Sequence, residues 1–310
     1  MGSANSADAC YALFVCRDKA EAGEQPSQLH RSRRMEKMKN RLGKKSFRCG
    51  KSRLLLLLLL LLAIVLKAPA TSFAARPLVT DDTGTVGKGK TQIELGAEWF
   101  SWKDTVEDVR VKETGTEASG VFTYGLSESV DLVAGFPYVW SRAKENGETV
   151  FSDDGLNDIS LEAKWRFFEK KGFGLALKPG ITFPTGDYEK GFGTGRVTYG
   201  LTFIATKELE PFAFHFNAGY TRNENKVDER KDLWSASLAA AYEAIKGLNI
   251  VGDIGFERNA DPTVKTAPAF ALVGLNYAIN DHVMLDAGYK FGLNKCEIDH
   301  GIIAGVTFNF

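Results

Sequence analysis

Apolar and polar residues alternate with a period of two through most of the chain after Lys90. The final stretch carries apolar side chains at every second position: Ile302, Ala304, Val306, Phe308 and Phe310. Such alternation is typical of a β-strand with one apolar and one polar face, whereas a helix repeats its apolar positions every three or four residues. The pattern therefore predicts an all-β protein.

Twelve segments of this kind can be counted, each 11–14 residues long. They span residues 91–102, 116–126, 129–142, 156–168, 173–184, 195–206, 211–222, 232–244, 247–258, 267–278, 282–293 and 299–310. A strand of this length crosses a bilayer when it is tilted by about 45°. Short connections alternate with longer polar ones, which are expected at 103–115, 143–155, 185–194, 223–231, 259–266 and 294–298.

Tight turns at one end and longer loops at the other are typical of an outer-membrane barrel with periplasmic turns and external loops. We therefore predict a transmembrane antiparallel up-and-down β-barrel of about 12 strands, formed by residues 91–310, in the cell outer membrane. Aromatic side chains near the segment ends fit the two membrane interfaces: Trp99, Trp140, Trp165, Trp234, Tyr124, Tyr138 and Tyr242. The alternative is a soluble β-sandwich or lipocalin-like barrel with its apolar faces inward. Mid-strand charges such as Glu98 and Asp253 weigh against it.

The front of the chain has the features of an export signal. An apolar run of 13 residues, Leu54–Leu66, follows three basic residues: Arg48, Lys51 and Arg53. The run is shorter than the roughly 20 residues of a membrane-spanning helix but matches the apolar core of a signal peptide. We predict cleavage after Ala74, which makes residues 1–74 a signal region with an over-extended N-terminus and residues 75–90 a periplasmic lead segment. A single membrane anchor is the alternative interpretation.

Charge is divided unevenly between the front of the chain and the body. Of 39 basic and 39 acidic residues, residues 1–74 contain 14 and 5, which leaves 25 basic and 34 acidic residues in the body. A nucleic-acid-binding protein needs positive charge on its folded domain. The net charge of −9 on the body therefore excludes that class.

The polar faces of the predicted strands carry isolated charges that a barrel would place in its lumen. Residues with this inward parity are Glu94, Glu98, Asp131, Glu162, Lys164, Arg166, Lys178, His215, Asn217, Glu243, Asp253, Glu257, Asp286 and Lys290. Eight acidic side chains against four basic ones predict a pore with a mild preference for cations. We expect a channel or transporter for small solutes. The alternative is a closed barrel, plugged by its own side chains, that acts on partners through its external loops.

No group of residues predicts catalysis, a metal site or a cofactor site. The histidines of the body, His215, His282 and His300, lack the serine and the orienting partner of a nucleophilic triad. The pairs Asp81–Asp82 and Asp153–Asp154 could bind Ca²⁺, but two carboxylates fall short of a full oxygen ligand set. Both pairs are therefore interpreted as solvent-exposed turns, and we expect the protein not to be an enzyme.

A glycine-rich stretch, Gly191–Gly195, resembles a phosphate-binding loop only superficially. It is not followed by Lys-Ser or Lys-Thr at the start of a helix, as such a loop requires. We interpret it as a flexible external loop, in which Tyr188 and Phe192 are candidates for a gate.

The ends of the strands indicate the partners. A terminal strand that closes on Phe310 resembles the signal that outer-membrane barrels present to the barrel assembly machinery, because a free amphipathic strand can pair with an exposed sheet edge. The acidic loops could bind lipopolysaccharide through divalent cations. Outer-membrane lipid, lipopolysaccharide, the assembly machinery and a small-molecule solute are the expected partners, and nucleic acid is not.

The start of the body adds a family resemblance. The stretch Ala75–Lys90, ARPLVTDDTGTVGKGK, is similar to the opening of an outer-membrane family described as "putative MetA-pathway of phenol degradation" transporters. Two further short motifs agree with the family, Phe183–Gly186 and Gly219–Tyr220. The resemblance covers essentially the whole body and implies a barrel that passes small compounds, aromatic ones among them. It implies no set of binding residues.

Overall fold

The computed structural model describes residues 76–106 and 108–310, so the predicted signal region lies outside the described residues. Thirteen strands make up most of this part of the chain: β1 (Thr91–Val106), β2 (Val109–Ser127), β3 (Val130–Glu145), β4 (Glu148–Leu156), β5 (Ile159–Lys170), β6 (Phe173–Phe183), β7 (Thr198–Leu209), β8 (Phe212–Arg222), β9 (Asp232–Ile245), β10 (Leu248–Glu257), β11 (Ala269–Asn280), β12 (Val283–Gly292) and β13 (His300–Asn309). One 3-10 turn, η1 (Tyr188–Lys190), lies between β6 and β7. Across the described ranges, no helix is long and apolar enough to cross a membrane.

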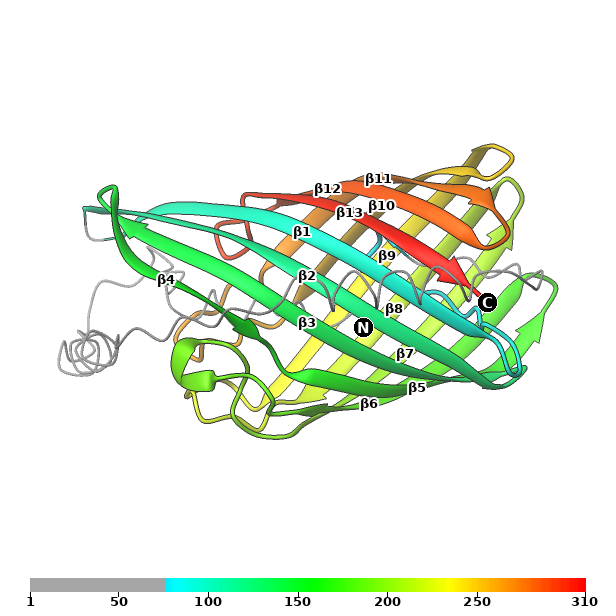
Figure 1. The fold of residues 1–310 in the computed structure, drawn as a ribbon, viewed down its shortest axis with the longest axis horizontal. Helices are drawn as coiled ribbons and strands as arrows, with labels where there is room; N and C mark the ends of the chain where they lie inside the picture. Colours follow the sequence, from blue (N-terminus) through cyan, green and yellow to red (C-terminus); the bar gives the residue numbers. More distant parts are fainter. Residues whose placement is uncertain (1–75, 107) are drawn as a thin grey trace, which may run out of the picture. The chain divides into compact units, whose positions relative to one another are not determined.

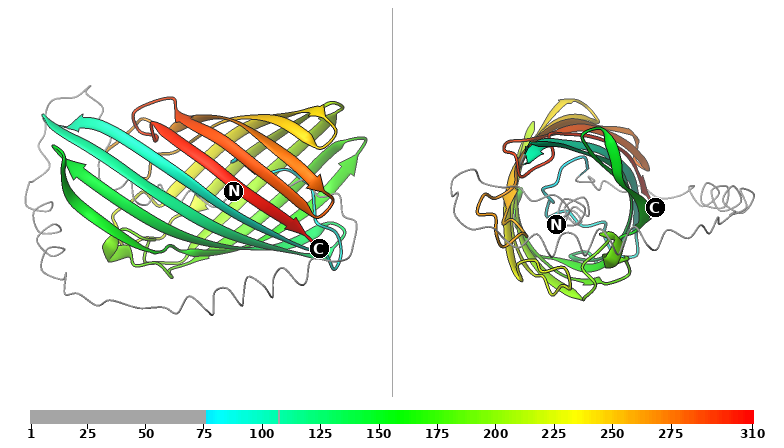
Figure 2. Two further views of the ribbon diagram at one scale, coloured as in Figure 1. Left: turned by 45° about the horizontal axis from the view of Figure 1, so that its top comes forward. Right: turned by 90° about the vertical axis from the view of Figure 1, so that its left-hand side faces the viewer.

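The strands form one closed antiparallel barrel. Strands that follow one another in the chain pair with each other, except β4 and β5, and the last strand, β13, returns to pair with β1. β4 and β5 pair with consecutive stretches of β3 and are two parts of one strand of the wall, interrupted at residues 157–158. The barrel therefore has twelve strands, as predicted, and Figure 2 shows the ring that they form in the end view.

The two ends of the barrel differ in their connections. At one end, two-residue turns join the strands at 128–129, 171–172, 210–211, 246–247 and 281–282. The chain also begins and ends the barrel here, where the backbone groups of Thr91 and Phe310 exchange hydrogen bonds. We refer to this as the turn end and to the opposite one, where the longer connections lie, as the loop end.

The prediction of long loops at 103–115 and 143–155 is wrong. These residues continue the strands into two projecting hairpins, which end at the Val106–Val109 and Glu145–Glu148 pairs. Figure 1 shows β1 to β4 reaching beyond the other strands at the loop end. A hairpin that projects beyond a membrane meets water on its outer face, so the alternation that reveals a membrane-facing strand is lost there.

The outer face of the wall is apolar. Large side chains with outward parity are strongly exposed on every side of the barrel, which contradicts the soluble alternative with inward apolar faces. Trp234 and Tyr242, on β9, are 48% and 40% exposed and lie near its two ends. Eight residue positions along the strand place them about 27 Å apart, which is roughly 20 Å of height at a tilt near 40° and close to the apolar belt of about 25 Å.

The inner face carries polar side chains and three small apolar clusters. Phe100 packs on Ile298, and Val139 packs on Phe192, both near the loop end. The third cluster consists of Phe270, Leu272 and Ile303. The barrel interior is thus where the buried contacts of this protein lie.

Candidate functional site

Residues 76–90, which precede β1, lie in the lumen, enclosed by the barrel wall. We call them the lead segment; Figure 2 shows them in cyan within the ring of strands. The sequence led us to expect a periplasmic lead segment at residues 75–90. In the structure, residues 76–90 form hydrogen bonds and ion pairs with inward-facing side chains of strands around the whole barrel.

The lead segment enters the lumen from the turn end. The Gly89 N–H donates to the Gly125 carbonyl at 2.8 Å, and the Gly125 N–H donates to the Lys90 carbonyl at 3.0 Å. Gly125 leaves no room for a Cβ because the Gly87 carbonyl lies against it. Further along, the Val86 N–H donates to the Asp131 carboxylate at 3.0 Å. The segment is therefore fastened to β2 and β3 where it enters.

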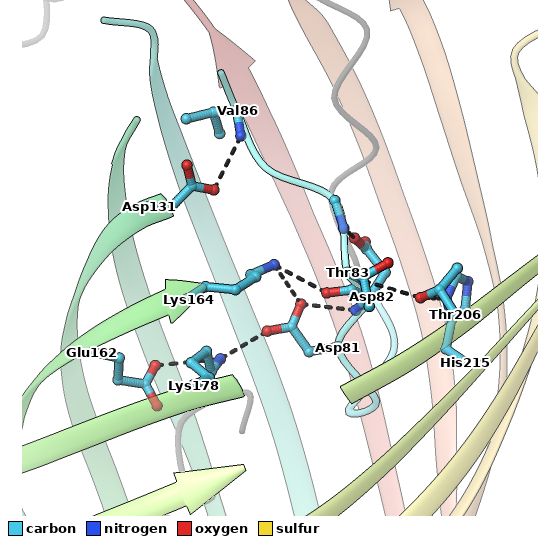
Figure 3. Close-up of polar contacts among 11 residues, drawn as sticks. Asp81, Asp82, Thr83, Val86, Asp131, Glu162, Lys164, Lys178, Thr206 and His215 are labelled. Carbon is cyan, nitrogen blue, oxygen red and sulfur yellow. Dashed lines mark hydrogen bonds and ion pairs between the residues drawn. The ribbon is translucent and has the colours of Figure 1, made fainter. Parts of the chain in front are cut away.

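Asp81 is the centre of an ion-pair cluster on one side of the lumen. Its carboxylate oxygens lie 2.9 Å from Lys164 Nζ and 2.8 Å from Lys178 Nζ. Lys164 also donates to the Asp82 carbonyl at 3.2 Å, and Lys178 lies 3.4 Å from the Glu162 carboxylate. Figure 3 shows both ammonium groups converging on the segment from β5 and β6.

The lysines determine the charge of Asp81. Burial alone would raise the pKa of this carboxyl, but the ammonium groups of Lys164 and Lys178 more than offset burial and hold its pKa well below the usual range. The Asp81–Asp82 pair was interpreted as a solvent-exposed turn. In the structure, the first of these carboxylates is a mostly buried partner of two lysines.

Thr80 is held on the opposite side of the lumen. The backbone N–H groups of Val79 and Thr80 both donate to one Asp253 carboxylate oxygen at 2.8 Å, and the Thr80 hydroxyl donates to the other oxygen at 2.7 Å. Thr80 Oγ1 also lies 2.7 Å from Ser237 Oγ on β9. Asp253 therefore accepts three hydrogen bonds from two consecutive residues, which fixes the position of the segment along β10.

Two further contacts hold the same stretch against β7 and β8. With its amide oriented to satisfy both groups, Asn217 accepts from the Asp81 N–H at 2.7 Å and donates to the Asp81 carbonyl at 2.9 Å. The Thr83 N–H donates to Thr206 Oγ1 at 3.0 Å, and this hydroxyl lies 3.1 Å from His215 Nδ1. Figure 3 shows Thr206 and His215 beside Thr83. The contacts to Asn217 and Thr206 complete the polar surroundings of residues 79–83.

The first residues of the segment meet an apolar part of the wall. Leu78 and Val79 pack against the cluster of Phe270, Leu272 and Ile303. Pro77 lies over Gly274 and Gly288, where a Cβ would come within 2.6 and 3.1 Å of the proline ring. Because glycine has no side chain, these two positions on β11 and β12 leave room for the segment.

Arg76 completes the set of contacts. Its Nε lies 3.3 Å from the Asp286 carboxylate on β12, and its Nη2 donates to the Ala304 carbonyl on β13 at 3.4 Å. Its own carbonyl accepts from Asn276 on β11 at 3.4 Å, and its guanidinium lies against Gly96 on β1. Every strand of the wall except β4 thus contributes a contact to the lead segment.

Six of the residues predicted to line the lumen contact the lead segment directly: Asp131, Lys164, Lys178, Asn217, Asp253 and Asp286. Glu162 and His215 touch its immediate partners. Sequence reasoning missed the segment residues that meet them, because no local pattern in residues 76–90 points to partners so distant in the chain.

The remaining predicted residues lie elsewhere on the inner face or at its rims. Glu94 and Glu98 are half-buried on β1, and Lys290 forms an ion pair of 3.2 Å with Glu297 near the loop end. Arg166 donates to the Glu128 carbonyl at the turn end. Two residues stand at strand ends, Glu243, which is exposed and accepts from the Gly247 N–H at 3.3 Å, and Glu257, the last residue of β10.

The loop predicted as a flexible gate is fastened to the wall. Phe192 is fully buried against Val139 on β3. The Asp158 carboxylate accepts from the N–H groups of Gly186 and Thr194 at 3.0 and 2.8 Å, and from the Thr194 hydroxyl at 3.1 Å. These contacts hold both ends of the loop, residues 184–197, at the break between β4 and β5.

The other groups considered for chemistry have structural partners. Asp153 forms an ion pair of 3.1 Å with Lys190, and Asp154 accepts a hydrogen bond from Tyr138. His282 Nδ1 lies 3.0 Å from the Asn309 carbonyl, and His300 Nδ1 lies 2.7 Å from the Tyr289 hydroxyl. Residues 76–106 and 108–310 contain no group of three or more metal-ligating side chains.

Comparison with known proteins agrees with the fold. Residues 74–310 match the protein family described as "Putative MetA-pathway of phenol degradation". The COG4313 outer membrane channel from Pseudomonas putida F1 is similar in structure, with a TM-score of 0.58 and 16% sequence identity over 74% of this chain and 98% of that chain. The P. putida toluene transporter TodX aligns with a TM-score of 0.44 and 10% identity over 79% and 99% of the two chains. The NanC porin gives 0.45 and 9% over 70% and 100%.

The fold and its outer surface agree on where the protein resides. A closed barrel satisfies every backbone hydrogen bond within its wall and can therefore cross a hydrocarbon layer. The exposed apolar belt bounded by aromatic side chains is the outer surface that such a barrel presents to lipid. The chain is an outer-membrane β-barrel.

Proposed function

The chain belongs to the family described as "Putative MetA-pathway of phenol degradation", and on that basis we propose that it is an outer-membrane channel for small solutes whose resting state is closed by its own lead segment. The barrel supplies the path across the membrane. The lead segment supplies the closure, and a solute passes when the segment leaves its position.

The observation that carries this proposal is the way the segment is held. Its polar contacts with the wall are hydrogen bonds, two lysine–aspartate ion pairs and an arginine–aspartate pair, and its apolar contacts are those of Pro77, Leu78 and Val79. The segment is covalently joined to the barrel through β1. An irregular segment held mainly by polar contacts can exchange these contacts for water. The barrel wall retains all of its own backbone pairing when that happens.

Single-channel recording in planar bilayers tests the proposal. The variant replaces residues 77–86 with a Gly-Ser linker of equal length, and heat-modifiable migration on gels shows that it is folded. We expect the wild type to be closed for most of the record and the variant to give sustained conductance steps. A folded variant that stays silent would contradict the channel and would favour a closed barrel that acts through its loops.

A further inference from the structure

The lead segment presents two different chemistries to two walls of the lumen. Leu78 and Val79 pack on the apolar cluster around Phe270. Asp81 places its carboxylate between Lys164 and Lys178 on the other side. Residues 78–81 thus present an apolar part to one wall and a carboxylate to the other, with the polar Thr80 between them held by Asp253.

The wall that carries Lys164 and Lys178 needs an anion to balance its charge. In the part of the chain that the structure describes, the hydrogen bonds of the Lys164 ammonium group go to the lead segment, namely to the Asp81 carboxylate and the Asp82 carbonyl. Glu162 forms an ion pair with Lys178. If Asp81 departs, the largely buried ammonium group of Lys164 loses its ion-pair partner, which is costly unless another anion replaces the carboxylate.

The distance between the two chemistries is that of a small molecule. Asp81 is three positions after Leu78, and an extended chain of that length spans at most about 10 Å. Pro77 lies against Gly274 and Gly288, which adds an apolar contact beside the cluster. An organic anion with a compact apolar body can therefore reach both walls at once.

We propose that these two walls form a binding site for small organic carboxylates with an apolar body, and that residues 78–81 occupy it as an internal stand-in for the solute. The inference rests on the proposed function, because the site is vacated only when the lead segment leaves. Solute and segment then compete for the same lysines. A solute that binds only the vacated state shifts the barrel towards that state.

Isothermal titration calorimetry of the purified, folded protein in detergent tests the site by measuring the dissociation constant of benzoate. Asp81→Asn removes the competing charge while keeping the size of the side chain. Apparent affinity falls with the fraction of protein whose site is free, so we expect benzoate to bind Asp81→Asn at least about tenfold more tightly than the wild type. The double variant Asp81→Asn/Lys164→Met should lose that gain.

Two related compounds and one control variant separate the parts of the claim. Benzamide has the ring without the charge, and acetate has the charge with almost no apolar body. The affinity of neither compound should therefore rise in Asp81→Asn as that of benzoate does. Asp281→Asn, which neutralises an exposed acid in a turn, should bind benzoate as the wild type does. An equal gain for benzamide or acetate, or no benzoate binding to Asp81→Asn, would overturn the site. If benzoate does not bind to Asp81→Asn, Glu162 or Asp131 would be the groups that neutralise Lys164 and Lys178.

Conductance of the same Asp81→Asn protein distinguishes this inference from the channel proposal. A variant that conducts but does not bind benzoate overturns the site and leaves the channel intact. A variant that binds benzoate but never conducts supports the site and overturns the channel.

Discussion

Two parts of the barrel interior are held in physically different ways. The lead segment, nearer the turn end, is held mainly by ion pairs and hydrogen bonds to side chains that lie 45 to 210 residues away, and its partly buried Leu78 and Val79 pack on the Phe270 cluster. The loop of residues 184–197, nearer the loop end, is held by the fully buried Phe192 ring as well as by Asp158, and it is joined to strands on both sides. The first arrangement can be exchanged for water or a charged solute. The second cannot open without exposing a buried aromatic side chain.

The comparison reverses the roles that the sequence had indicated. The glycine-rich loop was the candidate gate, and residues 75–90 were expected to be a periplasmic lead. The contacts now indicate that the lead segment is the movable element and that the loop is part of the fixed scaffold. Three substitutions and a change of pH test that division.

Reversing the charge of Asp81 should have the largest effect. Asp81→Lys places three ammonium groups together where two lysines now share one carboxylate. Breaking a buried pair in this way costs about 3–5 kcal/mol, or roughly 150- to 5000-fold in the ratio of closed to open states. Single-channel recording should therefore show a barrel that is open for most of the record. Asp281→Lys, at an exposed turn, is the matched control, and equal opening in both variants would rule out a specific role for Asp81.

Removing the aromatic anchor should affect the loop end alone. Phe192→Ala deletes a fully buried ring, at a cost of about 3 kcal/mol or more. The loop should then be cleaved by a protease roughly 100-fold faster than in the wild type, as followed by mass spectrometry of the fragments. The closed state in bilayer recordings should persist. An open channel in Phe192→Ala would show that the loop, and not the lead segment, is the gate.

A methyl group beneath Pro77 should have a smaller effect on closure. A Cβ at Gly288 would lie 3.1 Å from the proline, so the segment must shift by a few tenths of an ångström. We expect Gly288→Ala to raise the open probability several-fold. Gly252→Ala is the control, because its Cβ meets only the Leu272 carbonyl at an ordinary 3.8 Å. Equal open probabilities in the two variants would mean that the segment does not press on this part of the wall.

Acidification should have the smallest effect on the Asp81 ion pairs. The lysines hold the pKa of docked Asp81 below that of a free Asp, which is about 3.9. The pairs therefore stabilise the docked segment fully above that value and are lost only as the pH falls through the lower docked pKa. The ratio of open probabilities of Asp81→Asn and the wild type should stay within about twofold between about pH 7.5 and about pH 5. A ratio that falls to one at the lower pH would mean that Asp81 is already protonated there.

The sequence revealed the wall of the barrel because a lipid-facing strand must alternate. Ile250, Ile254 and their equivalents on other strands face outward in the structure, and the inward residues are those that alternate with them. The projecting hairpins escaped prediction where no lipid enforces the pattern. The break between β4 and β5 also escaped, since Asn157 and Asp158 are as typical of a turn as of a strand interruption.

The lead segment was beyond local reasoning for a different reason. Its position depends on partners such as Asp253 and Asp286, which lie more than 170 residues away. One signal did exist: Lys164 and Lys178 share inward parity, and two buried ammonium groups require a counter-charge. The sequence contains several acids that could provide it, and only the three-dimensional arrangement identifies Asp81.

A reversible cross-link between the lead segment and β9 tests whether the segment occupies the lumen and closes it. Thr80→Cys and Ser237→Cys, in a background with the native cysteines replaced by serine, place sulfur atoms where two hydroxyl oxygens are now 2.7 Å apart. We expect this pair to form a disulfide in the folded protein, to remain silent in bilayers, and to regain wild-type openings after reduction. The control pair combines Thr80→Cys with Ser141→Cys, near the loop end, and should not form a disulfide. Failure of the Thr80–Ser237 pair to form a disulfide, or sustained conductance of the cross-linked protein, would contradict the account.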